Sequence, residues 1–311
     1  MTSELHVVVE SSERLPSSVL NSLWYLAIIP GIPTILLLAW MKRFAHRRDQ
    51  RSRRPFDEMP RPAGWSLQQR TADLMESFTV NLLGGFAVSA VFWAIAALGK
   101  ASPPMMLGIG LIACSVLFYR ATRLILSYSN HRLGLLGEQV VGRILDQLSS
   151  DSVRVFHDLE VREPGGKPWN IDHVVVTPAA VFAVETKTRR KARGTAPDGQ
   201  EGHKVIFDGQ QLRFPAPMSA DRHGLEQARR NAEWLSGKLT ALNGCPIPVI
   251  PVLVLPGWWV EATGKGPVTA INHKQLPGFL TKRATTLNPE RQRAIAAQLE
   301  ERTRIDLSLP G

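Results

Sequence analysis

The sequence predicts an α/β domain preceded by an all-α transmembrane region of about three helices. Three long apolar runs fall between residues 19 and 122, and the first of them is long enough to cross a bilayer core. From about Asn130 onwards, short β-branched runs alternate with amphipathic helical segments, as in a soluble α/β domain. The chain has 311 residues, enough for one domain of moderate size and a second region.

The composition is basic and poor in cysteine. Lys and Arg number 37 against 27 Asp and Glu, which gives a formal charge of +10. This excess suits nucleic acid or an anionic membrane surface without choosing between them, and a merely basic soluble surface is the alternative. Two cysteines, Cys114 and Cys245, are too few for a disulfide framework or a cysteine-based metal site. Any metal must therefore be bound by oxygen atoms or by histidine nitrogens.

The first apolar run covers residues 19–41. It follows a short polar segment, residues 1–18, that lacks the positive start of a signal peptide. Aromatic residues lie toward the ends of the run, as at membrane interfaces, and a buried soluble helix is the alternative. The basic segment 42–54 follows directly, so the positive-inside rule makes residues 42–77 a cytoplasmic loop and residues 1–18 extracytoplasmic. A solvated linker or a nucleic-acid-binding arm is the alternative for this segment.

The second and third runs predict a helical hairpin of spans at about residues 78–98 and 104–122. Small residues in the second run allow close helix packing. Arg120 and Arg123 close the third run on the cytoplasmic side. Residues 19–127 then form a transmembrane region of three spans. Because the third run is shorter, two spans with an interfacial third segment are the alternative.

The domain predicted for residues 128–311 then lies in the cytoplasm. We expect a multi-pass protein of a bacterial inner (plasma) membrane, with the lipid bilayer as a partner. Within the domain the pattern predicts helices at residues 134–148 and 221–242 and from Asn288, strands at 153–161 and 248–255, and hairpins at 171–184 and 203–214.

The stretch from Trp169 to Arg190 carries the clearest chemistry. Two β-branched runs flank a Thr-Pro-Ala-Ala break, and a tight turn there places Asp172 opposite Glu185. Like charges facing each other across a ladder are destabilising unless a cation offsets them. Lys187 follows Glu185 by two residues, so both side chains point to one face of the strand. The pattern predicts two acids and one amine in a cluster, and a buried ion pair or charged strand end is the alternative.

Such a cluster has a use in phosphate chemistry. Two carboxylates hold a divalent metal, which acidifies a bound water and neutralises charge on a phosphate. A lysine beside them orients that water. The spacing D-x(12)-E-x-K in this chain resembles the PD-(D/E)xK nuclease motif.

Residues outside this stretch are further candidates. Glu138 falls on the apolar stripe of a predicted helix, where a carboxylate is costly without a partner, although a first-turn acid also favours the helix dipole. Gln227 lies beside the buried stripe of a later helix and can reach substrate or metal-bound water, with a surface glutamine as the alternative. A basic run past Lys187 is either a solvated strand end or a clamp on a nucleic-acid backbone. This run consists of Arg189, Arg190, Lys191 and Arg193.

The order of these features resembles the NERD (nuclease-related) domain, a branch of the restriction-endonuclease-like superfamily. The shared features are Gly137-Glu138 on a helix, the segments IDHVVV and VFAVETK, an Asp-Gly hairpin, a Gln227-Ala228 helix and an apolar strand. The resemblance covers roughly residues 133–260. It implies a restriction-endonuclease-like α/β domain, with a central mixed sheet flanked by helices and a magnesium-dependent site at the sheet edge.

The resemblance also implies roles for individual residues. Asp172, Glu185 and Glu138 would be ligands of Mg²⁺ (or Mn²⁺), Lys187 would position the water, and Gln227 matches the downstream helix glutamine. Two loops depart from the family. Thr188 and a basic run stand where the family often has asparagine and glycine, and Ala216-Pro217 stands where it often has an Asn-Pro pair. These departures leave the substrate open.

The sequence thus predicts a membrane-anchored, metal-dependent nuclease that hydrolyses phosphodiester bonds of cytoplasmic nucleic acid, with DNA expected ahead of RNA. One alternative is a catalytically silent, membrane-tethered nucleic-acid-binding protein. Another is a sensor or scaffold whose function lies in the spans. The first and second apolar runs carry no charge deep inside, which argues against an ion or proton path.

Overall fold

The computed structural model describes residues 40, 43, 58–97, 103–191 and 201–306, with the side chains of residues 89–107 excepted. The chain divides into two compact units. Unit 1 comprises Met1–Arg53 and Ser77–Arg123, and unit 2 comprises Arg54–Glu76 and Leu124–Gly311. Unit 2 therefore contains a segment that the sequence pattern assigned to the basic loop before the second span.

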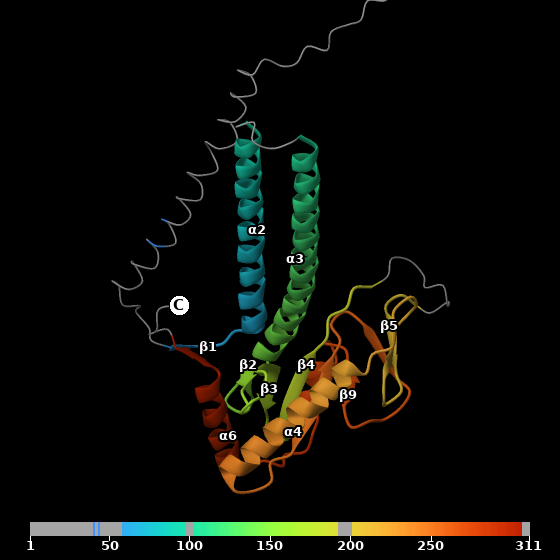
Figure 1. Cartoon of the computed structure of the whole chain (residues 1–311). Helices are drawn as coiled ribbons and strands as arrows, with labels where there is room; N and C mark the ends of the chain where they lie inside the picture. Colours follow the sequence, from blue (N-terminus) through green and yellow to red (C-terminus); the bar gives the residue numbers. More distant parts are fainter. Residues whose placement is uncertain (1–39, 41–42, 44–57, 98–102, 192–200, 307–311) are drawn as a thin grey trace, which may run out of the picture. The chain divides into compact units, whose positions relative to one another are not determined.

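Two long helices run through both units. They are α2 (Trp65–Ala97) and α3 (Pro103–Asp146), and they lie side by side in unit 1 (Figure 1). A Cβ atom added to Gly85 of α2 would lie 3.2 Å from Leu117 Cδ1 of α3. The small residue thus allows the close helix packing expected of the hairpin. Large apolar side chains in unit 1 are exposed: Val80, Leu82, Phe86, Val88, Ile109, Leu111, Ile112, Val116, Phe118 and Tyr119.

Among the residues searched, one helix segment is long and apolar enough to cross a membrane. This segment is Gly108–Asp146, whose most apolar window has a mean hydropathy of 1.6. Length and composition alone are weak evidence for membrane insertion. The span expected at residues 19–41 lies outside the described residues except for Trp40. The three predicted spans are therefore not confirmed, and one candidate helix stands in their place.

Helix α3 is longer than the sequence pattern indicated. A third span ending near residue 122 and a separate helix beginning at Gly134 were expected, but the structure has one helix from Pro103 to Asp146. The connecting residues contain no proline, and glycine is absent between Gly110 and Gly134. With no breaker in this stretch, the backbone hydrogen bonds of the helix continue.

Unit 2 is built on a mixed five-stranded sheet in the order β2-β3-β4-β7-β9. Pairs β2/β3 and β3/β4 are antiparallel, whereas β4/β7 and β7/β9 are parallel. The mixed sheet fits a nuclease-like α/β domain. The strands are β2 (Arg154–Val161), β3 (Trp169–Val176), β4 (Val181–Thr186), β7 (Val249–Val254) and β9 (Thr269–Ile271).

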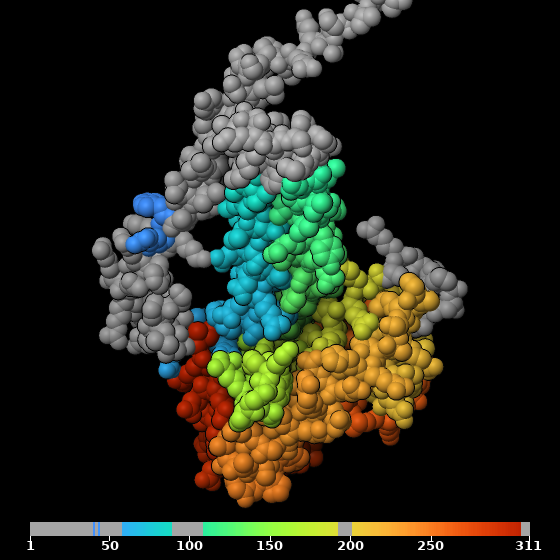
Figure 2. Space-filling view, in the orientation of Figure 1, coloured from blue at the N-terminus to red at the C-terminus, as the bar shows by residue number. Residues whose placement is uncertain are grey.

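Helices cover both faces of this sheet. On one face, α4 (His223–Asn243) and α6 (Pro289–Arg302) pack against β2, β3 and β4, and both helices reach the surface of unit 2 (Figure 2). On the other face lie the C-terminal end of α3 and the short α5 (Leu276–Thr281). The expected buried stripe of α4 is confirmed: Leu225, Ala228, Ala232, Leu235 and Leu239.

The central hairpin has the predicted register. Its ladder pairs Val176 with Val181 and continues to His173 and Val184. At the turn, the Thr177 hydroxyl accepts hydrogen bonds from the N–H groups of Ala179 and Ala180, both at 3.1 Å, and so fixes the reversal. One more step in this register brings Asp172 opposite Glu185.

Two small sheets complete unit 2. The order β6-β5-β8 joins β5 (Lys204–Phe207), β6 (Leu212–Arg213) and β8 (Trp259–Ala262). The expected hairpin turns at Gly209, whose φ of 96° favours glycine. Strand β1 (Glu58–Pro60) pairs with β10 (Arg304–Asp306). Asn288 caps α6 as predicted, because its side chain accepts from the Arg291 N–H at 2.8 Å.

Candidate active site

The two predicted acids lie at one end of the central hairpin, where β3 begins and β4 ends. Asp172 and Glu185 are both buried. The Oδ2 atom of Asp172 accepts a hydrogen bond from the backbone N–H of Thr186 at 2.7 Å. This bond ties the carboxylate of β3 to the strand that carries Glu185, so the hairpin itself brings the two acids together.

Lys187 joins the acids as predicted. Its Nζ atom lies 2.9 Å from Glu185 Oε1 and donates to Gln227 Oε1, also at 2.9 Å. Gln227 therefore reaches the site from α4, where it holds the lysine. A Cβ atom on Gly224, one turn earlier in α4, would lie 3.1 Å from Lys187 Cγ, so this glycine leaves room for the lysine stem.

Asn231 is a member of the site whose role the sequence pattern did not reveal. It lies one helical turn after Gln227 and is buried. Its Nδ2 atom donates to Glu185 Oε2 at 2.9 Å, and its Oδ1 atom accepts from Trp169 Nε1 at 3.1 Å. Both carboxylate oxygens of Glu185 are therefore engaged. The spacing of four residues between two amide side chains beside a buried stripe was the available signal.

Glu138 enters from α3 and is buried beside the other acids, as its place on the apolar stripe predicted. Preceding it, Gly137 permits a close approach of α3 to the segment after Lys187. A Cβ atom on Gly137 would lie 1.7 Å from Thr188 Oγ1, which is far inside any contact distance. Glycine is therefore required where α3 meets the candidate site.

Burial and mutual repulsion favour the protonated forms of these acids. Burial, together with the charges of Asp158 and Glu185, raises the pKa of Glu138 to about 8. Burial and the charges of Glu185 and Glu138 hold the pKa of Asp172 well above its usual range. Burial also raises the pKa of Glu185 in spite of Lys187. Burial lowers the pKa of Lys187, but Glu185, Asp172 and Asp221 together outweigh it, so this pKa is raised. Ionisation of all three acids would thus bring more negative charge than one lysine offsets.

The carboxylate side chains of this site are ligands of the type that binds a divalent cation. Glu138, Asp172 and Glu185 are near enough to influence one another's pKa, and hard cations such as Mg²⁺ prefer oxygen ligands. However, in the part of the chain that the structure describes, no group of three or more His, Cys, Asp or Glu side chains is positioned to hold a metal ion. The ion pair of Lys187 with Glu185 and the hydrogen bond from Asn231 occupy the Glu185 oxygens. A metal at Glu185 would share a carboxylate oxygen with Lys187 or Asn231, or displace one of them.

Asp158 on β2 is a further acid that the sequence analysis missed. It is buried, and it is a non-glycine residue with a positive φ of 52°. Its carboxylate accepts from Ser66 Oγ and Asn170 Nδ2, both at 2.7 Å, and Arg61 donates to its carbonyl oxygen at 3.1 Å. A left-handed residue interrupts the strand alternation that a sequence pattern assumes. It adds negative charge to the field around Glu138.

The basic run after Lys187 is partly engaged within the domain. Arg189 Nη2 lies 2.7 Å from Asp221 Oδ2, and its guanidinium carbon lies 4.8 Å from the Phe214 ring centroid. Arg190 donates to the hydroxyl of Ser129 at 2.7 Å. Lys191 lies over the ring of Trp258. Arg193 lies outside the described residues. The expected contacts with a nucleic-acid backbone stay a prediction.

Comparison with known proteins gives a relative and a family match. A stretch of 54 residues is 41% identical to an uncharacterized protein of Bacillus anthracis. This stretch is 17% of the present chain and 26% of the relative, so the chain spans about a quarter of that protein's length. No solved structure matches the chain significantly. Residues 133–256 match the nuclease-related domain, NERD. The matched segment includes the candidate site residues Glu138, Asp172, Glu185, Lys187 and Gln227. A nuclease-related domain is therefore present within unit 2.

Proposed function

We propose that the protein is a membrane-anchored, metal-dependent nuclease that acts on cytoplasmic nucleic acid, with DNA preferred to RNA. The convergence of Glu138, Asp172, Glu185 and Lys187 at one sheet end supports this, because it lies inside the segment that matches the nuclease-related domain. A cluster of acids with one lysine is the set of groups that phosphodiester hydrolysis by activated water needs.

Each group has a role in this proposal. Asp172, Glu185 and Glu138 would hold Mg²⁺ or Mn²⁺, which supplies Lewis-acid stabilisation of the phosphate when it is bound. The Nζ atom of Lys187 orients the attacking water and stabilises its deprotonated form. Gln227 and Asn231 fix the lysine and Glu185 from α4. Arg190, Lys191 and Arg193 would neutralise neighbouring phosphates.

The test uses the full chain purified in detergent. It is incubated with linear, circular and single-stranded DNA and with RNA, in Mg²⁺, in Mn²⁺ or in EDTA. We expect cutting in either metal, and a loss of about 100-fold or more in Asp172→Asn and Lys187→Ala, because loss of outer partners of metal ligands alone costs about 10- to 100-fold. Glu233→Gln, an exposed acid on α4, is the matched control. Undiminished cutting by both site variants would refute the proposal.

A catalytically silent nucleic-acid-binding protein is the second candidate. The ion pair between Lys187 and Glu185, and the absence of a ready metal group among the described residues, favour it. It predicts salt-sensitive binding in EDTA that Asp172→Asn leaves unchanged, with no cutting in any metal. The incubations above separate the two candidates.

Membrane anchoring is supported by the exposed apolar side chains of unit 1. Contiguous apolar surface on a soluble protein is costly, whereas lipid contact removes the cost. Helix α3 begins at Pro103 and unit 1 ends at Arg123, so the part of α3 in unit 1 is about as long as the ~20 residues that a span needs. Sedimentation of the expressed protein with membranes after an alkaline carbonate wash would support an integral anchor. Its release into the supernatant would refute one.

A further inference from the structure

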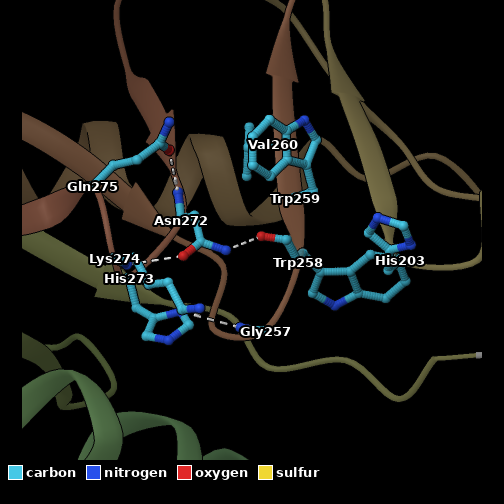
Figure 3. Close-up of a pocket in the computed structure, with 9 residues that line it drawn as sticks. All are labelled: His203, Gly257, Trp258, Trp259, Val260, Asn272, His273, Lys274 and Gln275. Carbon is cyan, nitrogen blue, oxygen red and sulfur yellow. Dashed lines mark hydrogen bonds between the residues drawn. The ribbon is translucent and has the colours of Figure 1, made fainter.

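A pocket of about 420 Å³ lies in unit 2, lined by His203, residues 257–260 and residues 272–275 (Figure 3). It begins just past the C-terminal ends of the parallel strands β7 and β9, which follow β4 in the sheet. In open α/β sheets, ligands bind outside the carboxyl ends of the strands. The volume falls within the range of small-ligand sites, about 300–1,000 Å³.

Hydrogen bonds connect one wall of the pocket to the segment that carries Lys187. The Lys187 N–H donates to the Val254 carbonyl at 2.9 Å, three residues before the pocket begins at Gly257. Trp258 Nε1 then donates to the Arg189 carbonyl at 3.3 Å, and Lys191 Nζ lies 5.7 Å from the Trp258 ring centroid. Strands β4 and β9 are two strand spacings apart, about 10 Å. A short length of nucleic acid can therefore reach both places.

One wall of the pocket offers an aromatic surface. Trp258 is fully buried and fixes the segment, whereas Trp259, the next residue, is 61% exposed. Indole rings present a broad flat face at a low cost in conformational entropy, because only two χ angles are fixed. An exposed tryptophan in a pocket that a lysine also lines, here Lys274, is an arrangement that proteins use to stack nucleic-acid bases.

The opposite segment offers polar groups that are held in place. The Gly257 N–H donates to His273 Nδ1 at 3.2 Å, so a neutral His273 carries its proton on Nε2. Burial and the charge of Lys274 lower the pKa of His273, which keeps the ring neutral and Nε2 a donor. Asn272 accepts from the Lys274 N–H at 2.8 Å and donates to the Trp258 carbonyl, so the loop is fixed before any ligand binds (Figure 3).

We infer that this pocket binds an unpaired nucleobase of a single-stranded nucleic acid, stacked on Trp259, with the adjoining phosphate near Lys274. A base that stacks face-on against a side chain must have left a duplex, so the pocket selects single strands or frayed ends. This inference rests on the proposed nuclease function and specifies its substrate class. A free mononucleotide has the same chemistry and is distinguished by the test.

The test reads binding by the full chain in EDTA, so that cutting plays no part. A fluorescein-labelled 15-nucleotide oligothymidylate is titrated by anisotropy. We expect Trp259→Ala to weaken binding by about fivefold or more, since stacking is worth about 1–3 kcal/mol per base, and Trp259→Phe to retain most of the affinity. Lys274→Ala should lower the slope of log K against log salt by about 0.7, as for loss of one phosphate contact to a single strand. Lys238→Ala on α4 is the matched control.

Three outcomes would overturn the inference. They are unchanged affinity of Trp259→Ala for the single strand, an equal loss of affinity for a blunt duplex, and binding of thymidine monophosphate as tight as that of the strand. The two proposals fail separately. Wild-type cutting with binding independent of Trp259 removes this inference and keeps the nuclease. Binding through Trp259 without metal-dependent cutting removes the nuclease and keeps the base site.

Discussion

At the scale of single residues, the site is governed by acids that are kept from ionising. The ordinary pKa of Glu138 is 4.5, and its pKa in the folded protein is about 8. At pH values between these two, the folded protein keeps the proton of Glu138. In this window the unfolded chain is ionised and the folded chain is not, so raising the pH opposes folding. The stability contributed by the protonated acid is complete below pH 4.5 and is lost as the pH rises toward 8 and beyond.

We therefore expect the metal-free protein to melt at a lower temperature at pH 8.5 than at pH 6. Glu138→Gln, which cannot ionise, should reduce this difference, and Glu233→Gln at the exposed end of an ion pair should not. Thermal unfolding followed by circular dichroism in EDTA measures the effect. A pH dependence that is the same in Glu138→Gln and in the wild type would show that another group carries it.

Asn231 provides a second expectation at this scale. Asn231→Ala leaves Glu185 Oε2 and Trp169 Nε1 without their partner. An unsatisfied buried polar group costs about 1–3 kcal/mol, so we expect destabilisation of that order in urea unfolding. Asn243→Ala, at the C-terminal end of the same helix, removes a half-buried amide as the control. Equal losses in the two variants would contradict a special role for Asn231.

At the scale of elements, the close approach of α3 to the end of β4 sets the position of Glu138. Gly137→Ala would place a methyl group against Thr188, so we expect a loss of about 1–3 kcal/mol, as for other overpacked sites. Thr188→Ala removes the clashing hydroxyl, and the double variant should recover part of the loss. A double-mutant cycle from urea unfolding measures this coupling. Additive losses would contradict the contact.

The sequence predicted those elements whose signals are local. The register of the β3–β4 hairpin follows from two β-branched runs about one turn, and it suffices to pair Asp172 with Glu185. The buried stripe of α4 follows from helical spacing. Asp158 escaped notice because its positive φ depends on tertiary contacts with Ser66 and Asn170, which lie far away or on another strand. The pocket at Trp259 escaped notice because it forms only where separate strands end.

At the scale of the whole molecule, the two cysteines report on topology. Cys114 is exposed on α3 in unit 1, and Cys245 is half-buried in unit 2. With a membrane-impermeant maleimide on intact cells, we expect no labelling of either thiol. After lysis Cys245 should react, whereas Cys114 should react only in detergent, because lipid shields it. Variants Cys114→Ser and Cys245→Ser identify each signal. Labelling of Cys245 in intact cells would place the nuclease-related domain outside.

The division of the chain into two units restricts how many times the chain can cross a membrane. Unit 2 is assembled from Arg54–Glu76 and Leu124–Gly311, and Arg61 and Ser66 of the first piece contact Asp158 of the second. A single folded body cannot lie on both sides of a bilayer. If the stretch between residues 76 and 124 enters a membrane, it must therefore return to the side from which it left, which requires an even number of crossings. If the apolar part of α3 enters a membrane and crosses it, the stretch before it has crossed as well, whatever the charges of the flanking loops.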